Sequence, residues 1–216
     1  MKKYVHVIWD WNGTLLEDVE MCVSVINGIL AGKKLPQLTV EKYREVFTIP
    51  VIDYYNKLNF DFEEESFESI GSRFIRTYEE RKYECDLYSG SLEILDTLSR
   101  KGVKQSVLSG YYQDTLNEII KHFGLTNYFE HLVGMDNIYA GSKVANGKNL
   151  LSKINHIAGK ILLIGDTCHD YEVAKEIEAD CILLENGHQS EQQLKNCGAM
   201  TLKNQKELLS YLIENI

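Results

Sequence analysis

The sequence has only two prolines in its 216 residues, and it shows no repeat, no low-complexity tract and no proline- or glycine-rich linker. Any domain boundary must therefore be found from a change in the pattern of helices and strands. No apolar run reaches the length of a membrane span, and Met1-Lys2-Lys3 leads straight into an apolar stretch. These absences argue against a transmembrane helix and against a signal peptide.

Cysteine is sparse as well. The five cysteines are an odd number, they are scattered along the chain, and no two of them form a C-x-x-C pair. This usage is typical of reduced thiols in a reducing compartment, so we expect a cytoplasmic protein.

An excess of positive charge is also missing. The chain has 23 Lys and Arg against 32 Asp and Glu, which gives a net charge of −9. This balance argues against binding to nucleic acid or to an anionic membrane surface. Hydrophobic residues make up 44% and charged residues 25%, as in ordinary soluble proteins with an ample core. We expect a small-molecule partner and a monomer or weak homodimer.

What the sequence does contain is a strong opening stretch, YVHVIWDWNGTLL, over Tyr4–Leu16. Its first part, Tyr4–Trp9, is a nearly continuous apolar and aromatic run, which predicts a strand buried on both faces of a parallel sheet. Asp10 ends this strand, and Asn12-Gly13-Thr14 follows at once. A carboxylate at the carboxyl end of a buried first strand lies where open α/β sheets bind their ligands.

The pattern of elements changes near residue 85. Residues 17–84 predict helices and no convincing strand, whereas residues 85–216 alternate between helices and strands. Alternation of this kind implies right-handed crossovers and a parallel sheet covered on both faces. We therefore expect an α/β fold: a Rossmann-like core of 1–16 and 85–216 with an inserted all-helical cap domain of 17–84. The predicted helices of the cap span 18–30, 39–47, 51–58 and 63–83. The predicted core strands after the first span 104–108, 132–133, 160–164 and 181–184, with an edge strand near Thr201, and a core helix is predicted over 148–157.

Two further polar features lie near the ends of predicted elements. Ser109-Gly110 closes the strand that contains QSVL, and it would place a hydroxyl and a flexible backbone N–H at the edge of the sheet. An ordinary turn explains it equally well. Lys143 and Lys148 in GSKVANGKNLL form a basic element, although either lysine could be a solvated surface residue.

The stretch Gly165–Asp170, GDTCHD, closes the apolar strand KILLI and opens a helix. Its two carboxylates, Asp166 and Asp170, would repel one another unless a cation binds between them or they cap the helix. A helix cap explains Asp170 alone, so a metal site is the favoured interpretation of the pair.

Taken together, these motifs resemble the four signatures of the haloacid dehalogenase-like hydrolases, in the phosphoglycolate-phosphatase-like branch with a helical cap after the first signature. The resemblance covers essentially the whole chain. It implies that Asp10 is the nucleophile, that Ser109 binds phosphate, and that Asp166 and Asp170 belong to the acidic signature that holds Mg²⁺.

The resemblance also implies a lysine of the third signature, for which Lys143 is preferred to Lys148 because its distance to the acidic signature fits better. Asp10 would attack phosphorus and form an aspartyl-phosphate that water then cleaves. Mg²⁺ and the lysine would spread the negative charge, with Asp10, Asp166, Asp170 and the backbone carbonyl of Asn12 as metal ligands. Backbone N–H groups around Asn12, Gly13 and Gly110 would hold phosphate oxygens.

One position departs from the family pattern. The residue two after the nucleophile is normally an Asp that acts as general acid, and here it is Asn12, which cannot exchange a proton. The loss of a general acid costs ~10²–10⁴ in rate. The favoured function is nonetheless a Mg²⁺-dependent phosphomonoester hydrolase acting on a small phosphorylated metabolite. The alternatives are a catalytically weak phosphate-ligand binding protein and a phosphonatase-like or dehalogenase-like hydrolase.

Other residues are weaker candidates for the site. His188 or His169 could supply the proton transfer that Asn12 cannot, although an exposed loop histidine is the simpler interpretation. In the cap, four residues are candidates to contact the leaving group, with core packing or solvated faces the more common explanation for each: Arg44, Tyr54, Tyr55 and Arg73.

Overall fold

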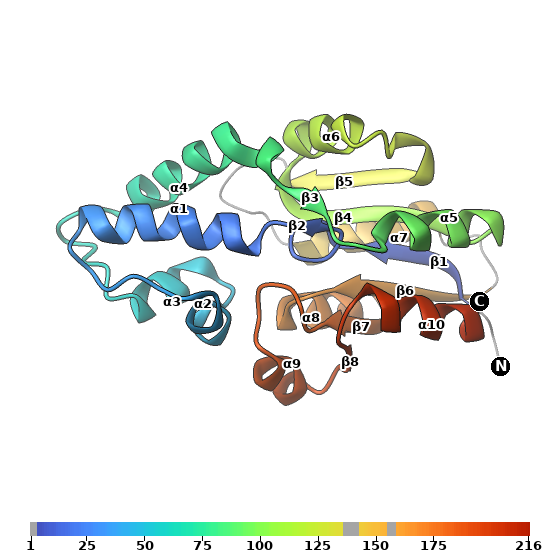
Figure 1. The fold of residues 1–216 in the computed structure, drawn as a ribbon. Coiled ribbons are helices and arrows are strands. Elements are labelled where there is room, and N and C mark those ends of the chain that lie inside the picture. Colours follow the sequence, from blue (N-terminus) through green and yellow to red (C-terminus); the bar gives the residue numbers. More distant parts are fainter. Residues whose placement is uncertain (1–3, 136–142, 155–158) are drawn as a thin grey trace.

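The computed structural model describes residues 4–135, 143–154 and 159–216, and these parts of the chain form a six-stranded parallel sheet with helices on both faces (Figure 1). The strands lie in the order β5-β4-β1-β6-β7-β8, so the predicted α/β fold class is confirmed. In chain order, these strands are β1 Tyr4–Trp9, β4 Lys104–Tyr112, β5 His131–Met135, β6 Lys160–Gly165, β7 Asp180–Leu184 and β8 Met200–Leu202.

Strand β1 lies inside the sheet and is buried on both faces, as its apolar run predicts. Val7 and Trp9 pack into the large core together with residues of α5 and α10, whereas Ile8 packs into a second core with α7 and α8. Successive side chains of a strand point to opposite faces, so an unbroken apolar run serves two cores at once. The helices of this part are α5 Ser91–Arg100, α6 Gln113–His122, α7 Lys143–Ile154, α8 Cys168–Glu176, α9 Glu191–Cys197 and α10 Gln205–Asn215.

The strand order reverses at β1. This strand pairs with β4 on one side and with β6 on the other, and both pairings are parallel. The chain therefore builds the sheet outward in both directions from β1, which makes the carboxyl end of β1 the topological switch point. A crevice for ligands opens at such a point, because the connections leave on opposite faces.

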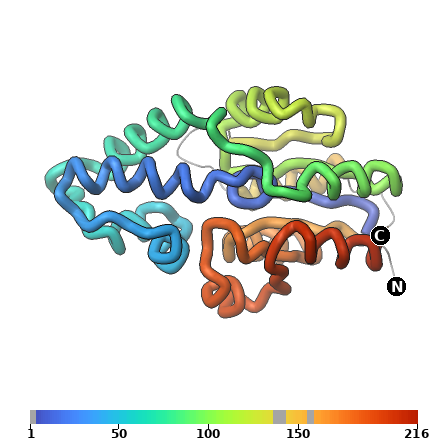
Figure 2. The backbone as a smooth tube through the Cα atoms, in the orientation of Figure 1, coloured from blue at the N-terminus to red at the C-terminus, as the bar shows by residue number. Residues whose placement is uncertain are grey.

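A two-stranded antiparallel ribbon joins the sheet to the helical segment. It consists of β2 (Leu16–Glu17) and β3 (Asp86–Leu87), with Leu16 paired to Leu87. Figure 2 shows the chain leaving the sheet through the first of these strands and returning through the second. Between them lie α1 Val19–Gly32, α2 Val40–Val46, α3 Val51–Lys57, α4 Phe67–Arg81 and a 3₁₀ turn at Lys82–Glu84. The structure corrects the prediction of no strand in 17–84, because Glu17 is paired with Asp86.

Some element boundaries also differ from those predicted. Helix α4 begins at Phe67 and not at 63, because the Ser66 side chain accepts a hydrogen bond from the backbone N–H of Ser69 and caps the helix there. Strand β4 continues past Leu108 to Tyr112. The helix predicted to start at 148 begins at Lys143, and the end predicted for it at 157 lies outside the described residues. None of the described helices is long and apolar enough to span a membrane.

Candidate active site

Three strand ends converge at the switch point. Asp10 follows β1, Ser109 lies in the last part of β4, and Asp166 follows β6. The backbone N–H of Asp10 donates to the carbonyl of Ile164 at 2.8 Å. This hydrogen bond extends the β1–β6 pairing by one residue and holds Asp10 beside β6. Asp10 is 7% exposed and Asp166 is 1% exposed, so the carboxylates are held away from bulk water.

Asp10, Asp166 and Asp170 form an acidic cluster. Each contributes one carboxylate oxygen to a group in which all of these atoms lie within 4.8 Å of one another. Burial, together with repulsion from Asp170, raises the pKa of Asp10 to about 6, and burial with repulsion from the other carboxylates raises the pKa of Asp166 to about 7. Three converging carboxylate oxygens at this spacing suit a hard divalent cation such as Mg²⁺.

Lys143 bridges two members of this cluster. Its Nζ lies 2.5 Å from Asp10 Oδ1 and 2.6 Å from Asp170 Oδ1. Burial lowers the pKa of the ammonium group, but Asp10 and Asp170 outweigh this effect and hold the pKa above its usual value. Lys148, in contrast, forms an exposed ion pair with Glu176. The structure thus brings Lys143, and not Lys148, to the acidic cluster.

Asp170 serves the helix and the cluster together. Its Oδ2 accepts hydrogen bonds from the Thr167 hydroxyl at 2.7 Å and the Thr167 backbone N–H at 3.0 Å, in a capping box at the start of α8. Its other oxygen faces Lys143. These charge-assisted contacts outweigh burial and lower the pKa of Asp170. Asp170 therefore caps α8 with one oxygen and pairs with Lys143 through the other.

The backbone and side chain at Asn12-Gly13 are engaged within the protein. Asn12 Nδ2 donates to Asp18 Oδ2 and to the Tyr78 hydroxyl, each at 2.8 Å. The Gly13 N–H, expected to be free for phosphate, donates to Asp18 Oδ1 at 2.9 Å and to the Leu16 carbonyl at 3.0 Å. Gly13 has a φ of +73°, and a Cβ here would lie 2.4 Å from Asp166 Oδ2. Only glycine fits this turn against the acidic cluster.

The second predicted signature is less tightly connected to the cluster. The Ser109 hydroxyl is buried at the end of β4 and accepts a hydrogen bond from the backbone N–H of Tyr111 at 3.1 Å. This leaves the hydroxyl proton of Ser109 available as a donor. Gly110 is exposed beside it.

Asp18 is the residue that the sequence interpretation missed. It occupies the N-cap position of α1, but its side chain makes no capping hydrogen bond. Its carboxylate instead accepts from Asn12, Gly13 and the Tyr78 hydroxyl (2.7 Å), and it lies 3.2 Å from His188 Nε2. Burial alone raises the pKa of Asp18, but these partners reverse the effect and lower it.

The two candidate histidines have different surroundings. His188 is buried, with Nδ1 2.9 Å from the Tyr43 hydroxyl, and its backbone N–H donates to Asp166 Oδ2 at 2.6 Å. Burial lowers the pKa of His188, but Asp18 and Asp166 raise it to about 9. The interpretation of His188 as an exposed loop residue is thus wrong. His169 lies on the surface of α8, 3.3 Å from Glu172.

The four candidates in the helical segment have partners other than the carboxylates of the acidic cluster. Arg44 donates to the carbonyls of Gly187 at 2.8 Å and Asn186 at 2.7 Å, so it ties α2 to the loop after β7. Arg73 pairs with Glu65 within the helical segment. Tyr54 and Tyr55 pack in the aromatic core of the helical segment. Tyr78 and Tyr43 of the helical segment do reach the site, and their hydroxyls had no distinguishing signal in the sequence.

A parallel sheet with a lysine-bridged acidic cluster at its switch point defines an α/β enzyme. The model of the haloacid dehalogenase-like hydrolase family matches residues 7–184, and the chain belongs to that family. It is similar to pyrophosphatase PpaX of Listeria welshimeri, with 25% identity over 182 residues that cover 82% of this chain and 81% of the relative.

Solved structures share the fold over nearly the whole chain. A haloacid dehalogenase-like hydrolase from Streptococcus pneumoniae superposes with a TM-score of 0.80 at 16% identity, covering 96% of this chain and 98% of the other. A predicted phosphoglycolate phosphatase from Haemophilus somnus gives a TM-score of 0.78 at 18% identity, covering 98% and 99%. The chain is therefore an enzyme of this hydrolase family.

Proposed function

We propose that the chain is a Mg²⁺-dependent phosphomonoester hydrolase that acts on a small phosphorylated metabolite through an aspartyl-phosphate at Asp10. The observation that carries the proposal is the acidic cluster of Asp10, Asp166 and Asp170 with the Lys143 ammonium between two of its members. A nucleophilic carboxylate and a phosphate are both anionic, so their approach requires this local concentration of positive charge.

The buried charges of the site agree with a divalent cation. Four carboxylates, those of Asp10, Asp166, Asp170 and Asp18, face one ammonium and one imidazole that are also buried. With His188 protonated and the carboxylates ionised, the site carries about two negative charges in excess. Asp10, Asp166 and the backbone carbonyl of Asn12 would hold Mg²⁺, with Asp170 beside them; the bound ion would polarise the phosphoryl oxygens and offset their charge.

The remaining groups of the site contact the substrate, orient the nucleophile or hold the loop after β1 in place. Lys143 fixes the orientation of the Asp10 carboxylate through Oδ1 and supplies a positive charge to the phosphoryl group. The Ser109 hydroxyl and the Gly110 N–H hold phosphate oxygens at the end of β4. Asn12 orients the leaving group through its amide oxygen, because its amide nitrogen donates to Asp18 and Tyr78. The Gly13 N–H acts indirectly by holding the turn closed onto Asp18.

The helical segment then serves as the cap. Residues 17–84 form the cap domain, and 1–16 with 85–216 form the core. Because the carboxylates are almost fully buried, substrate entry requires the cap to move from the core. The chain acts as a monomer or weak homodimer. The names of similar proteins, pyrophosphatase and phosphoglycolate phosphatase, make pyrophosphate and phosphoglycolate the first substrates to assay.

Asn12 favours a second candidate, a phosphate-ligand binding protein with little turnover, because an amide cannot donate a proton to a leaving group. An assay of inorganic phosphate release with a panel of metabolite phosphates and Mg²⁺ separates the two. The expected result is Mg²⁺-dependent release that Asp10→Asn abolishes, together with an acid-stable phosphate label on the native chain that the variant lacks. Saturable binding with no release supports the binding protein, and release that persists in Asp10→Asn excludes the covalent mechanism.

A further inference from the structure

Four N–H and O–H donors converge on the carboxylate of Asp18. Asn12 Nδ2 and the Tyr78 hydroxyl approach Oδ2 at 2.8 and 2.7 Å, and the Gly13 N–H and His188 Nε2 approach Oδ1 at 2.9 and 3.2 Å. The carboxylate is 1% exposed. Donors from the first loop, from α4 and from the loop after β7 thus surround one internal anion, an arrangement that suits a bound anionic ligand equally well.

This internal anion lies between the acidic cluster and the cap. One of its donors, Asn12, is two residues after the nucleophile, and another, Tyr78, belongs to α4 of the helical segment. Cys22 of α1 lies against it, with Sγ 3.7 Å from Oδ2. A leaving group that extends from a phosphate at Asp10 toward the cap would pass Asp18 and its donors.

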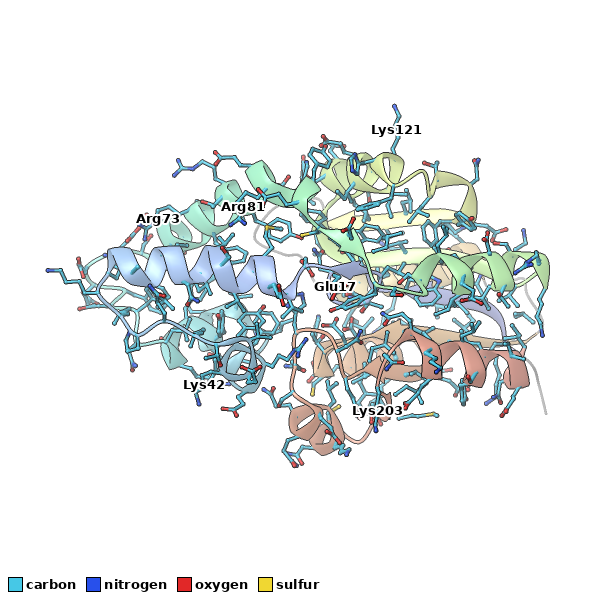
Figure 3. All side chains as sticks on the ribbon, viewed as in Figure 1. Glu17, Lys42, Arg73, Arg81, Lys121 and Lys203 are labelled. Atoms are coloured by element: carbon cyan, nitrogen blue, oxygen red, sulfur yellow. The ribbon has the colours of Figure 1, made fainter. Side chains whose placement is uncertain are left out.

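Four of the described cations of the cap already have partners of their own. Arg44 is bound to two carbonyls of the core, and Lys82 pairs with Glu79 and Glu118. Arg73 pairs with Glu65, and Arg81 pairs with Glu84; both lie along α4 in Figure 3. The sequence of residues 136–142, DNIYAGS, contains no lysine or arginine.

We propose that Asp18 is a specificity-determining residue that fills the anion-binding position on the leaving-group side, so that the enzyme takes phosphate esters whose leaving group carries no negative charge. The inference rests on the proposed function. A second carboxylate or phosphate group would face Asp18 and would find its four donors already occupied. A neutral or positively charged leaving group meets no electrostatic repulsion from the carboxylate, so only the anionic groups are disfavoured.

Matched substrates test this proposal. 2-Hydroxyethyl phosphate and 2-phosphoglycolate have nearly the same size and differ in a terminal hydroxyl or carboxylate; phosphoethanolamine and pyrophosphate extend the series to a cation and a second anion. The native chain is expected to prefer the first and third of these over the other two by at least about tenfold in kcat/KM. The preference is expected mainly in KM, because it concerns binding of a group that does not react.

Variants of Asp18 should change this ranking. Asp18→Asn removes the negative charge, and Asp18→Ser also leaves the donors around position 18 without their carboxylate acceptor. Both variants are expected to lower the KM for 2-phosphoglycolate and to reduce the preference for uncharged or cationic leaving groups about tenfold or more. Glu17→Gln is the matched control, because it removes the adjacent but exposed carboxylate at the base of the cap (Figure 3). It should leave the ranking unchanged.

The outcomes separate this inference from the function on which it rests. A native chain that prefers 2-phosphoglycolate or pyrophosphate overturns the role of Asp18 even if the variants fail to fold. The role is also overturned by folded Asp18 variants that lose activity equally on all four substrates, since a purely structural residue would behave in this way. No turnover of these four substrates or of an acyl phosphate by the native chain overturns the proposed function and the inference together.

Discussion

Asp170 Oδ1 and Asp10 Oδ1 share the same ammonium group, that of Lys143, at 2.6 and 2.5 Å. One lysine thereby connects the carboxyl end of β1 with the first turn of α8, and it does so from the first residue of α7. The substrate-binding role proposed for Lys143 is thus inseparable from its role in holding two buried carboxylates close together.

Replacement of this lysine tests both roles. Lys143→Met is expected to reduce turnover by a factor of about 10² or more, since it removes a charge from the reaction centre. It should also lower the free energy of unfolding by about 3 kcal/mol or more in the absence of Mg²⁺, because it leaves buried carboxylates unpaired. Lys148→Met should change stability by less than about 0.5 kcal/mol, because the pair with Glu176 is exposed. Steady-state kinetics and urea denaturation of both variants show which substitution has the larger effect. Equal effects of the two substitutions would reject Lys143 as the lysine of the reaction centre.

Divalent metal should stabilise the folded chain. If the acidic cluster binds Mg²⁺, a concentration one hundred times the Kd adds about 2.7 kcal/mol to the free energy of unfolding, and the melting temperature rises with occupancy. Asp166→Asn should abolish most of this rise, while Asp180→Asn, on the surface beside Lys160, should retain it. Differential scanning calorimetry with and without Mg²⁺ makes the comparison. A native chain whose melting temperature does not respond to metal contradicts the ligand set.

The hydrogen bond between Asn12 and Asp18 means that Asn12→Asp, which restores the usual residue of the family, should lower the stability of the fold when it is made alone. Asn12→Asp places two carboxylates where a 2.8 Å hydrogen bond now lies, and it should destabilise the fold by about 1–3 kcal/mol. The double variant Asn12→Asp/Asp18→Asn restores a donor opposite an acceptor, so thermal denaturation should show strong positive coupling between the two sites.

The same double variant tests the missing general acid. It should hydrolyse alkyl phosphates about 10²–10⁴ times faster than the native chain, with little gain on aryl or acyl phosphates, whose leaving groups scarcely need a proton. Mass spectrometry of the peptide around Asn12-Gly13 must accompany the assay, because this pair is prone to deamidation. Native protein with verified Asn12 that matches the variant on alkyl phosphates would show that another residue is the acid.

Acid should weaken the core through His6. This buried histidine has Nε2 2.9 Å from Ser106 Oγ, and burial lowers its pKa from 6.5 to about 4. The unfolded chain therefore binds the proton first as the pH falls, so up to about 3 kcal/mol of stability that is present above pH 6.5 is lost by about pH 4. His6→Asn removes this dependence. Urea denaturation at pH 7 and pH 4.5 should show the native advantage over the variant shrinking at the lower pH; a constant difference contradicts the burial of a neutral imidazole.

The sequence predicts those parts of the molecule whose structure is determined by residues close together in the chain. Tyr4–Trp9 can be predicted as a central strand because its unbroken apolar run suits a strand that is buried on both faces. The start of the helix after Thr39 can be predicted because the Thr39 hydroxyl accepts a hydrogen bond from the backbone N–H of Lys42, only three residues later. Asp18 is different: its partner Tyr78 is 60 residues away, and periodicity carries no information about such contacts. The short strands β2 and β3 were missed for a related reason, since two residues are too few to show alternation. The convergence of Asp10 and Lys143 across 133 residues was expected only through the family resemblance.

The pairing of Leu16 with Leu87 has a consequence for how such an enzyme changes over time. Because the entry and exit of the helical segment are fastened to each other, the ends of that segment meet at one point on the core. The helices between β2 and β3 can lengthen, shorten or be replaced together without altering the register of β1 against β4 and β6. The carboxylates then keep their mutual spacing while the surface that is proposed to contact the leaving group changes in sequence.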